Sequence, residues 1–216
     1  MKKLVSYFIL CFSFQSVFAS QTELEKVLSK YWNSTKVSMH VKKTIKQELL
    51  MGREKITEGT LIYSKGRLKL VYSKPENSEI VIDIDNIWLK QKVKSFGKSR
   101  WQVSKIKKSK VLKKSQTLLG LLFADNKMLK KFVFVEHAEK NKLSSYVLRP
   151  KNAEEFPGIN KLAIVTNSSF EIELLRQWDN LGNEISYRIT KSDFHAKFKL
   201  KQLDFVLPKN AELLHF

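Results

Sequence analysis

The stretch GTLIYSKGRLKLVYSKPENSEIVIDIDNIW, from Gly59 to Trp88, decides the fold of this chain. Apolar residues recur at every second position, as in Leu61 and Tyr63, which is the period of a strand with one buried face. Turn-forming residues separate the apolar runs at Lys65-Gly66-Arg67, Pro75-Glu76-Asn77 and Asp85-Asn86. The stretch therefore predicts four consecutive antiparallel strands that share one apolar face.

A helix is predicted before this meander. Ser20 or Thr22 can cap it, acidic residues follow in its first turn, and its apolar residues have helical spacing. These apolar residues are Leu24, Val27, Leu28 and Tyr31. From Val37 the period changes to two and continues toward Leu49, so a strand is expected there. Residues 53–64 form its partner, with a bulge expected near Glu58-Gly59.

The rest of the chain reads mostly as strands. They are expected at Phe132–Glu136, Leu143–Arg149, Lys161–Val165, Phe170–Trp178, Glu184–Thr190 and Leu203–Leu207. The exception is Ser115–Phe123, an apolar segment that predicts either a buried helix or a lid over the sheet. We expect a mainly β domain with a few helices, in which about eleven antiparallel strands curl into an incomplete barrel.

The first residues have the pattern of a secretory signal peptide. Lys2 and Lys3 precede an apolar run, and Ala19 stands where a signal peptidase cleaves. Residues 1–19 are thus expected to be removed, leaving residues 20–216 as one soluble, exported domain. Cys11 is the only cysteine, and Leu10 before it does not fit a lipidation signal. The exported domain would have neither disulfides nor thiolate sites.

The chain is strongly basic, with a formal charge of +19. Lysine is densest from Lys98 to Lys114. Such a stretch fits a solvated edge strand and loop, because lysine blocks edge-to-edge pairing. It also fits a surface that contacts anionic lipid head groups. The residues expected to make this contact are Lys105, Lys107, Lys108, Lys110, Lys113 and Lys114. A nucleic acid partner is not expected, because the chain is predicted to be exported and no stacking platform is evident.

Several short pieces lie along the chain in a recognisable order and spacing. They are Gly59-Thr60-Leu61, Lys65-Gly66-Arg67-Leu68, Asp83 with Trp88, Tyr146 to Lys151, Trp178 to Glu184, and Phe205-Val206-Leu207-Pro208. Together they resemble the LolA family of outer-membrane lipoprotein carriers. The resemblance implies a periplasmic carrier that holds lipoprotein acyl chains in an apolar cavity lidded by helices. It implies partners as well: acylated lipoproteins, an inner-membrane releasing transporter and an outer-membrane acceptor.

The expected cavity lining combines this resemblance with the strand faces. It consists of Leu61, Tyr63, Leu70, Tyr72, Trp88, Leu118, Leu122, Phe123, Phe132 and Phe134. Where the family has an arginine followed by proline, this chain has Lys65-Gly66. Lys65 is therefore expected either to act as a looser lid latch or to lie in solvent as a turn residue. Ile84 replaces a glycine that the family carries after the aspartate.

No catalytic or metal motif is recognised. The four histidines, His40, His137, His195 and His215, have no paired spacing, so no metal site and no cofactor are expected. Asp83 and Asp85 are assigned to a turn rather than to a pair of catalytic carboxylates. A monomeric, non-enzymatic carrier is expected. The alternatives are a periplasmic carrier of glycolipid or phospholipid with anionic head groups, and an envelope scaffold that binds proteins at a sheet edge.

Overall fold

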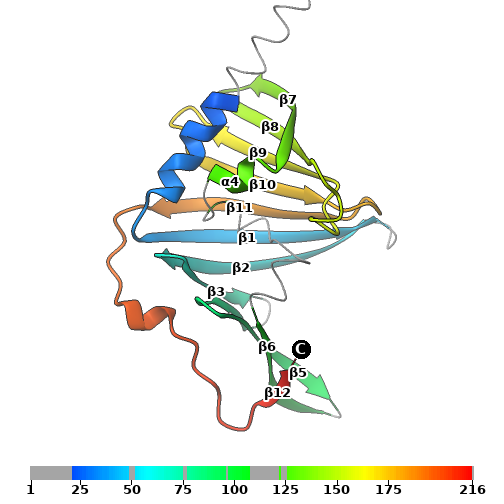
Figure 1. Cartoon of the computed structure of the whole chain (residues 1–216). Helices are drawn as coiled ribbons and strands as arrows, with labels where there is room; N and C mark the ends of the chain where they lie inside the picture. The colour runs from blue at the N-terminus through cyan, green and yellow to red at the C-terminus, as the bar shows by residue number, and fades with distance from the viewer. Residues whose placement is uncertain are drawn as a thin grey trace, which may run out of the picture.

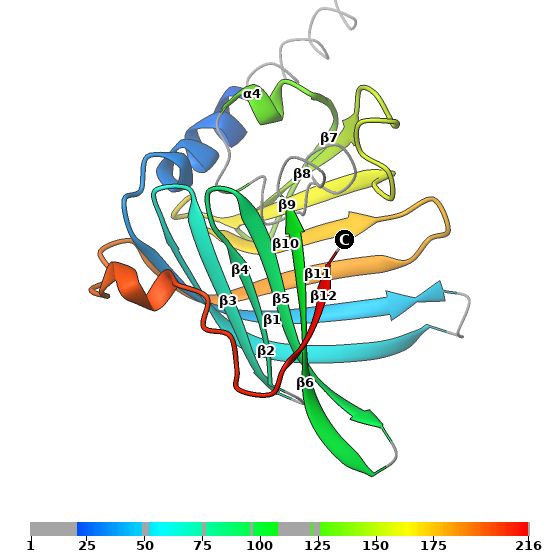
Figure 2. The ribbon, with the colours of Figure 1, turned by 60° about the horizontal axis from the view of Figure 1, so that its bottom comes forward.

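The structure, a computed structural model, describes residues 21–48, 52–74, 77–95, 97–107, 122 and 126–215. It is built on one large sheet that curls strongly without closing (Figures 1 and 2). The strands are β1 Val37–Gln47, β2 Arg53–Ser64, β3 Arg67–Lys74, β4 Ser78–Ile82, β5 Asn86–Ser95, β6 Lys98–Lys107, β7 Phe132–Lys140, β8 Leu143–Pro150, β9 Lys161–Asn167, β10 Ile172–Trp178, β11 Glu184–Asp193 and β12 Glu212–His215.

The strand order is β12-β6-β5-β4-β3-β2-β1-β11-β10-β9-β8-β7, which leaves β12 and β7 at the two edges. All neighbours are antiparallel except β12 and β6, which are parallel. The expected meander from Gly59 to Trp88 is confirmed as β2 to β5. Its first turn is formed by Lys65 and Gly66, which lie where a turn was expected. Both have positive φ angles, of 47° and 78°, as a tight hairpin turn requires.

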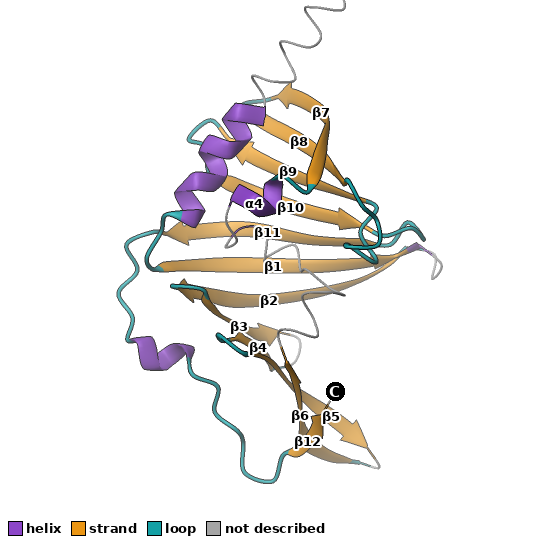
Figure 3. Ribbon diagram, viewed as in Figure 1, coloured by secondary structure: helices purple, strands orange, loops and turns teal. Residues whose placement is uncertain are grey.

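Helices are few in the described part of the chain (Figure 3). The N-terminal helix covers residues 21–32, α4 covers Asn126–Leu129, and the 3-10 helix η2 covers Leu200–Leu203. Leu24, Val27, Leu28 and Tyr31 are fully buried, as predicted, and join the core on the concave face of the sheet. The Tyr31 hydroxyl accepts a hydrogen bond from the amide of Ile172 at 2.9 Å. None of the helices described is long and apolar enough to cross a bilayer.

The expectation of a strand at Leu203–Leu207 is wrong. Residues 204–208 belong to a segment that crosses the convex face of the sheet before the chain enters β12 (Figure 2). The Arg67 guanidinium binds the Asp204 carboxylate, and Phe205 stacks on Trp88 with ring centroids 4.6 Å apart. Polar and apolar residues alternate in this segment because one side of it packs on the face of the sheet. Its backbone is not part of a strand. The described part of the basic stretch, Lys98–Lys107, is strand β6, and β12 pairs beyond it, so β6 is not an edge strand.

The predicted bulge is confirmed where β2 meets β3, because the register shifts between Glu58 and Gly59. The two backbones approach closely at Gly59. A Cβ atom there would lie 2.2 Å from the carbonyl oxygen of Val71 and 2.9 Å from the Cα of Tyr72. Only glycine therefore fits without moving a strand.

Replacing Gly59 with alanine is expected to lower the free energy of unfolding by about 1–3 kcal/mol, because the new methyl group overlaps backbone atoms. Urea denaturation measures the loss. Gly66→Ala is a suitable comparison, because its φ is +78° but nothing lies within 4 Å of a Cβ there. That change should cost only about 1 kcal/mol of backbone strain. A Gly59→Ala protein as stable as the unsubstituted chain would contradict the close approach.

Candidate functional site: the concave face

Strand register places two apolar rows side by side on the concave face. Directly paired residues of antiparallel strands share a face, so each row can be followed from strand to strand. One row contains Leu61, Leu70, Ile80 and Leu89, and the other contains Tyr63, Leu68, Ile82, Ile87 and Ile106. Leu214 on β12 extends the first row past Ser104. The rows thus cross half of the curved sheet.

The two halves of the concave face differ in how completely they are covered. Between β7 and β1 the face packs on the N-terminal helix and on Phe156 and Ile159, and forms a buried core. Toward the β12 edge the same face stays half-exposed at six apolar residues, here called the apolar strip. The apolar strip consists of Ile80, Ile82, Ile87, Leu89, Ile106 and Leu214. Six clustered aliphatic side chains that stay partly accessible form a surface on which hydrocarbon can be buried.

A polar row runs beside the apolar strip. It passes through Tyr72, Ser78, Gln91, Gln102 and Glu212 on successive strands. The side-chain amide of Gln91 donates to the Gln102 carbonyl at 3.0 Å. Arg100 shares this face and lies 3.2 Å from the Glu212 carboxylate. The concave face is thus amphipathic, with hydrocarbon on one side and hydrogen-bonding groups on the other.

Most of the predicted lining residues that the structure describes lie on the concave side. Leu61, Leu70 and Leu122 are fully buried, Tyr63, Tyr72 and Phe132 nearly so, and Phe134 packs partly against the same core. Leu118 and Phe123 lie outside the described residues, as does Ser115–Phe123 apart from Leu122. None of the six residues of the apolar strip was predicted as lining, although the period-two patterns of β4 and β5 contain four of them.

Trp88 requires a correction. It pairs with Val81, which pairs with Lys69, and all three lie on the convex face opposite Leu70 and Ile80. Its indole N–H donates to Asp83 at 3.0 Å, and its ring stacks on Phe205. Trp88 therefore holds the C-terminal segment on the outside of the sheet, and Leu89 takes the predicted concave position in β5.

Asp83 forms the turn between β4 and β5, as expected. It accepts hydrogen bonds from the amides of Asp85 and Asn86 at 2.8 and 2.7 Å and from Trp88. Burial alone would raise the pKa of Asp83, but these donors outweigh it and hold the pKa below its usual value. Three pieces of sequence behind the family resemblance, Asp83, Trp88 and Phe205, thus meet at one place.

The basic residues predicted to contact anionic lipid are only partly described. Lys105 is half-buried on the convex face, with its ammonium group 4.8 Å from the centre of the Trp88 ring. Lys107 is exposed. Lys108, Lys110, Lys113 and Lys114 lie outside the described residues. Lys65 is exposed at the tip of the β2–β3 turn, and because most of the predicted lid is not described, its role as a latch stays a prediction.

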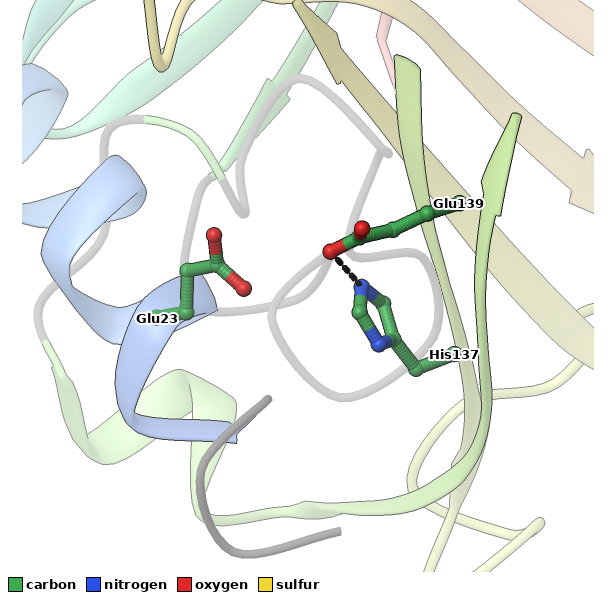
Figure 4. Close-up of side chains that lie close together, drawn as sticks. All are labelled: Glu23, His137 and Glu139. Atoms are coloured by element: carbon green, nitrogen blue, oxygen red, sulfur yellow. Dashed lines mark ion pairs between the residues drawn. The ribbon is translucent and has the colours of Figure 1, made fainter. Parts of the chain in front are cut away.

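Glu23, His137 and Glu139 come together at the far end of the concave face (Figure 4). One possible ligand atom from each lies within 4.8 Å of the others, and His137 Nε2 is 3.7 Å from the Glu139 carboxylate. Sequence spacing could not reveal this group, because the helix brings Glu23 to β7. The residue types suit a divalent cation, but Glu139 is largely exposed.

Comparison with known proteins supports the resemblance. The family model for the outer membrane lipoprotein carrier protein LolA matches residues 38–205. This range begins in β1 and ends at the residue that stacks on Trp88. No curated protein matches the chain.

The solved structures that match the chain are distant in sequence, and their TM-scores lie below 0.5. A LolA superfamily protein from Nitrosomonas europaea is 12% identical, with a TM-score of 0.46 over 86% of this chain and 97% of that one. A putative outer membrane lipoprotein-sorting domain from Vibrio parahaemolyticus is 10% identical, with a TM-score of 0.41 over 84% and 95%. The lipoprotein LppX of Mycobacterium tuberculosis is 13% identical, with a TM-score of 0.40 over 79% and 93%.

Proposed function

Because the chain belongs to the LolA family, we propose that it binds the acyl chains of lipoproteins on its concave face and carries them from the inner to the outer membrane. The observation that carries this proposal is the apolar strip, which leaves six aliphatic side chains half-exposed inside the curve of the sheet. Proteins of this family are binding and carrier proteins rather than enzymes. We accordingly assign no catalytic role to the site.

The physical need for such a carrier follows from the cost of exposing hydrocarbon. Transfer of acyl chains from a bilayer to water costs about 0.8 kcal/mol per methylene, so a multiply acylated protein cannot cross an aqueous compartment unaided. A carrier must shield the chains without holding them irreversibly. A half-covered face suits that task better than a closed, well-packed core, because loose complementarity lets an acceptor compete for the chains.

The remaining parts of the proposal concern location and partners. Residues 1–19 are proposed to be a cleaved signal peptide, which would place the carrier in the periplasm. We propose separately that it acts as a monomer. An inner-membrane transporter would load it and an outer-membrane acceptor would unload it, as the family resemblance implies. The exposed Lys107 and the lysines that follow it would contact anionic membrane surfaces in passing.

Native mass spectrometry tests this function. Protein produced without residues 1–19 is mixed with a triacylated peptide and, in parallel, with the same peptide lacking acyl chains. We expect a one-to-one complex with the acylated peptide only, and acylated cargo on protein isolated from the cells that make it. Lipid-free protein in every sample would contradict the proposed function.

A further inference from the structure

Lys43 occupies an unusual position for a lysine, in the middle of the concave face. It lies on the same face of β1 as Val41 and Ile45, and it pairs directly with Tyr187 on β11. Its ammonium nitrogen is 5.9 Å from the ring centre of Tyr72 and 5.7 Å from that of Tyr187. The two tyrosines are only 4% and 7% exposed. A half-buried ammonium group is therefore held between two buried phenol rings.

No ion pair among the described residues neutralises Lys43. Its direct partner on β2 is the uncharged Thr57, and Lys55 and Arg53, which follow on the same face, add positive charge. The carboxylates that the described strands place on this face belong to Glu139 and Glu212, and they lie on the two edge strands. Glu212 already faces Arg100. The centre of the concave face is thus cationic without a compensating acid.

An uncompensated cation in a partly buried site is costly unless something binds it. Burial lowers the pKa of Lys43, and the nearby charge of Lys55 lowers it further. Burial also raises the pKa of Tyr187 to about 12 and that of Tyr72 above its ordinary value, so both hydroxyl groups stay protonated and able to donate. The two hydroxyl groups also interact with each other, so the ammonium group and one phenol O–H form the donor set that can bind an oxyanion.

We propose that this site binds the acidic head group, a carboxylate or a phosphate, of an amphiphile whose acyl chain lies on the apolar strip. This inference rests on the proposed function and specifies its ligand class. The geometry favours a molecule with two ends, because Tyr72 begins the polar row that runs beside the apolar strip. Aromatic rings beside the ammonium group also limit its access to water, which strengthens its attraction for an anion.

Equilibrium binding of three single-chain amphiphiles of equal chain length tests the inference. Palmitate supplies a carboxylate, lysophosphatidic acid supplies a phosphate, and monopalmitoylglycerol is neutral. We expect at least one acid to bind the protein on the order of tenfold more tightly than the neutral lipid. A charge-assisted hydrogen bond contributes about that difference in affinity. The acid that binds more tightly identifies the head group.

Three variants make the test specific. Lys43→Met should remove the preference for the acid while keeping affinity for the neutral lipid, and Lys43→Arg should retain the preference. Lys42→Met is the control, because Lys42 points to the opposite face and lies 3.6 Å from Glu58. The inference is wrong if Lys43→Met lowers stability but still prefers the acid. It is also wrong if the unsubstituted protein binds all three lipids equally. Failure to bind any amphiphile would instead refute the proposed function, and this inference with it.

Discussion

Replacing Glu79 with alanine is expected to lower the free energy of unfolding by about 3 kcal/mol, because it leaves two largely buried ammonium groups without a carboxylate. The Glu79 carboxylate lies on the convex face, 2.9 Å from Lys69, and it also binds Lys90. Less than a fifth of each side chain is exposed. Urea denaturation at neutral pH measures the loss. Glu58→Ala is the matched control, because its pair with Lys42 is exposed and should contribute less than about 1 kcal/mol.

The same group predicts a pH dependence. Burial of Glu79 raises its pKa, but the hydrogen bonds and charges of Lys90 and Lys69 outweigh burial and leave the pKa below its ordinary value of 4.5. A carboxylate with a depressed pKa stabilises the fold fully above its unfolded value and loses that contribution as the pH falls through the folded value. The stability difference between the unsubstituted protein and Glu79→Gln should therefore be constant above about pH 5 and shrink below pH 4.5. A difference independent of pH would contradict the ion pairs.

Introducing a charge into the apolar strip is expected to reduce acyl-chain binding at least tenfold. Leu89→Asp places a carboxylate where we propose that hydrocarbon lies, and desolvating a carboxylate without a partner costs several kcal/mol. Leu89 is half-exposed on β5, so the change should cost less stability than one in the core. Titration with a fluorescent acylated peptide measures the dissociation constant.

Val71→Asp is the matched control for that experiment. Val71 is 40% exposed and pairs with Glu79, so it lies on the convex face. Its substitution should leave acyl-chain affinity unchanged. Equal loss of affinity in both variants would indicate that binding does not use the concave face, and melting temperatures of both variants show whether each remains folded.

Much of the fold could be predicted because its signals are local. The period of Leu24, Val27, Leu28 and Tyr31 identified both a helix and its buried face. The turn predicted at Lys65-Gly66-Arg67 lies there too, although Arg67 already belongs to β3. Trp88 was placed on the wrong face for a physical reason. The number of residues in a turn decides which face the side chains of the next strand occupy. Here Asp83 accepts a hydrogen bond from the amide of Asn86, and the turn closes so that Ile82 pairs with Ile87. Leu89, rather than Trp88, therefore continues the row.

The candidate site was only partly predictable. Lys43 could have been found, because it continues the alternation of Val37, Met39 and Val41, but its neighbours Tyr72 and Tyr187 come from distant parts of the chain. Leu203 and Phe205 alternate like a strand while packing on top of one, and period alone does not distinguish these cases. The group of Glu23, His137 and Glu139 could not be predicted, because it forms only when the N-terminal helix lies across the sheet. In each case the residue types were known, but their long-range placement was not.

The central claim is that foreign hydrocarbon occupies the concave face. Protein produced from residue 20 onward has no cysteine, so Leu89→Cys and Val71→Cys can each carry a single fluorescent label, on the concave and the convex face respectively. Quenching of each label by a triacylated peptide with a nitroxide on one acyl chain is the most direct test. The account predicts strong quenching at position 89 and little at position 71. Equal quenching at both positions, or none at position 89 while the peptide is bound, would contradict it.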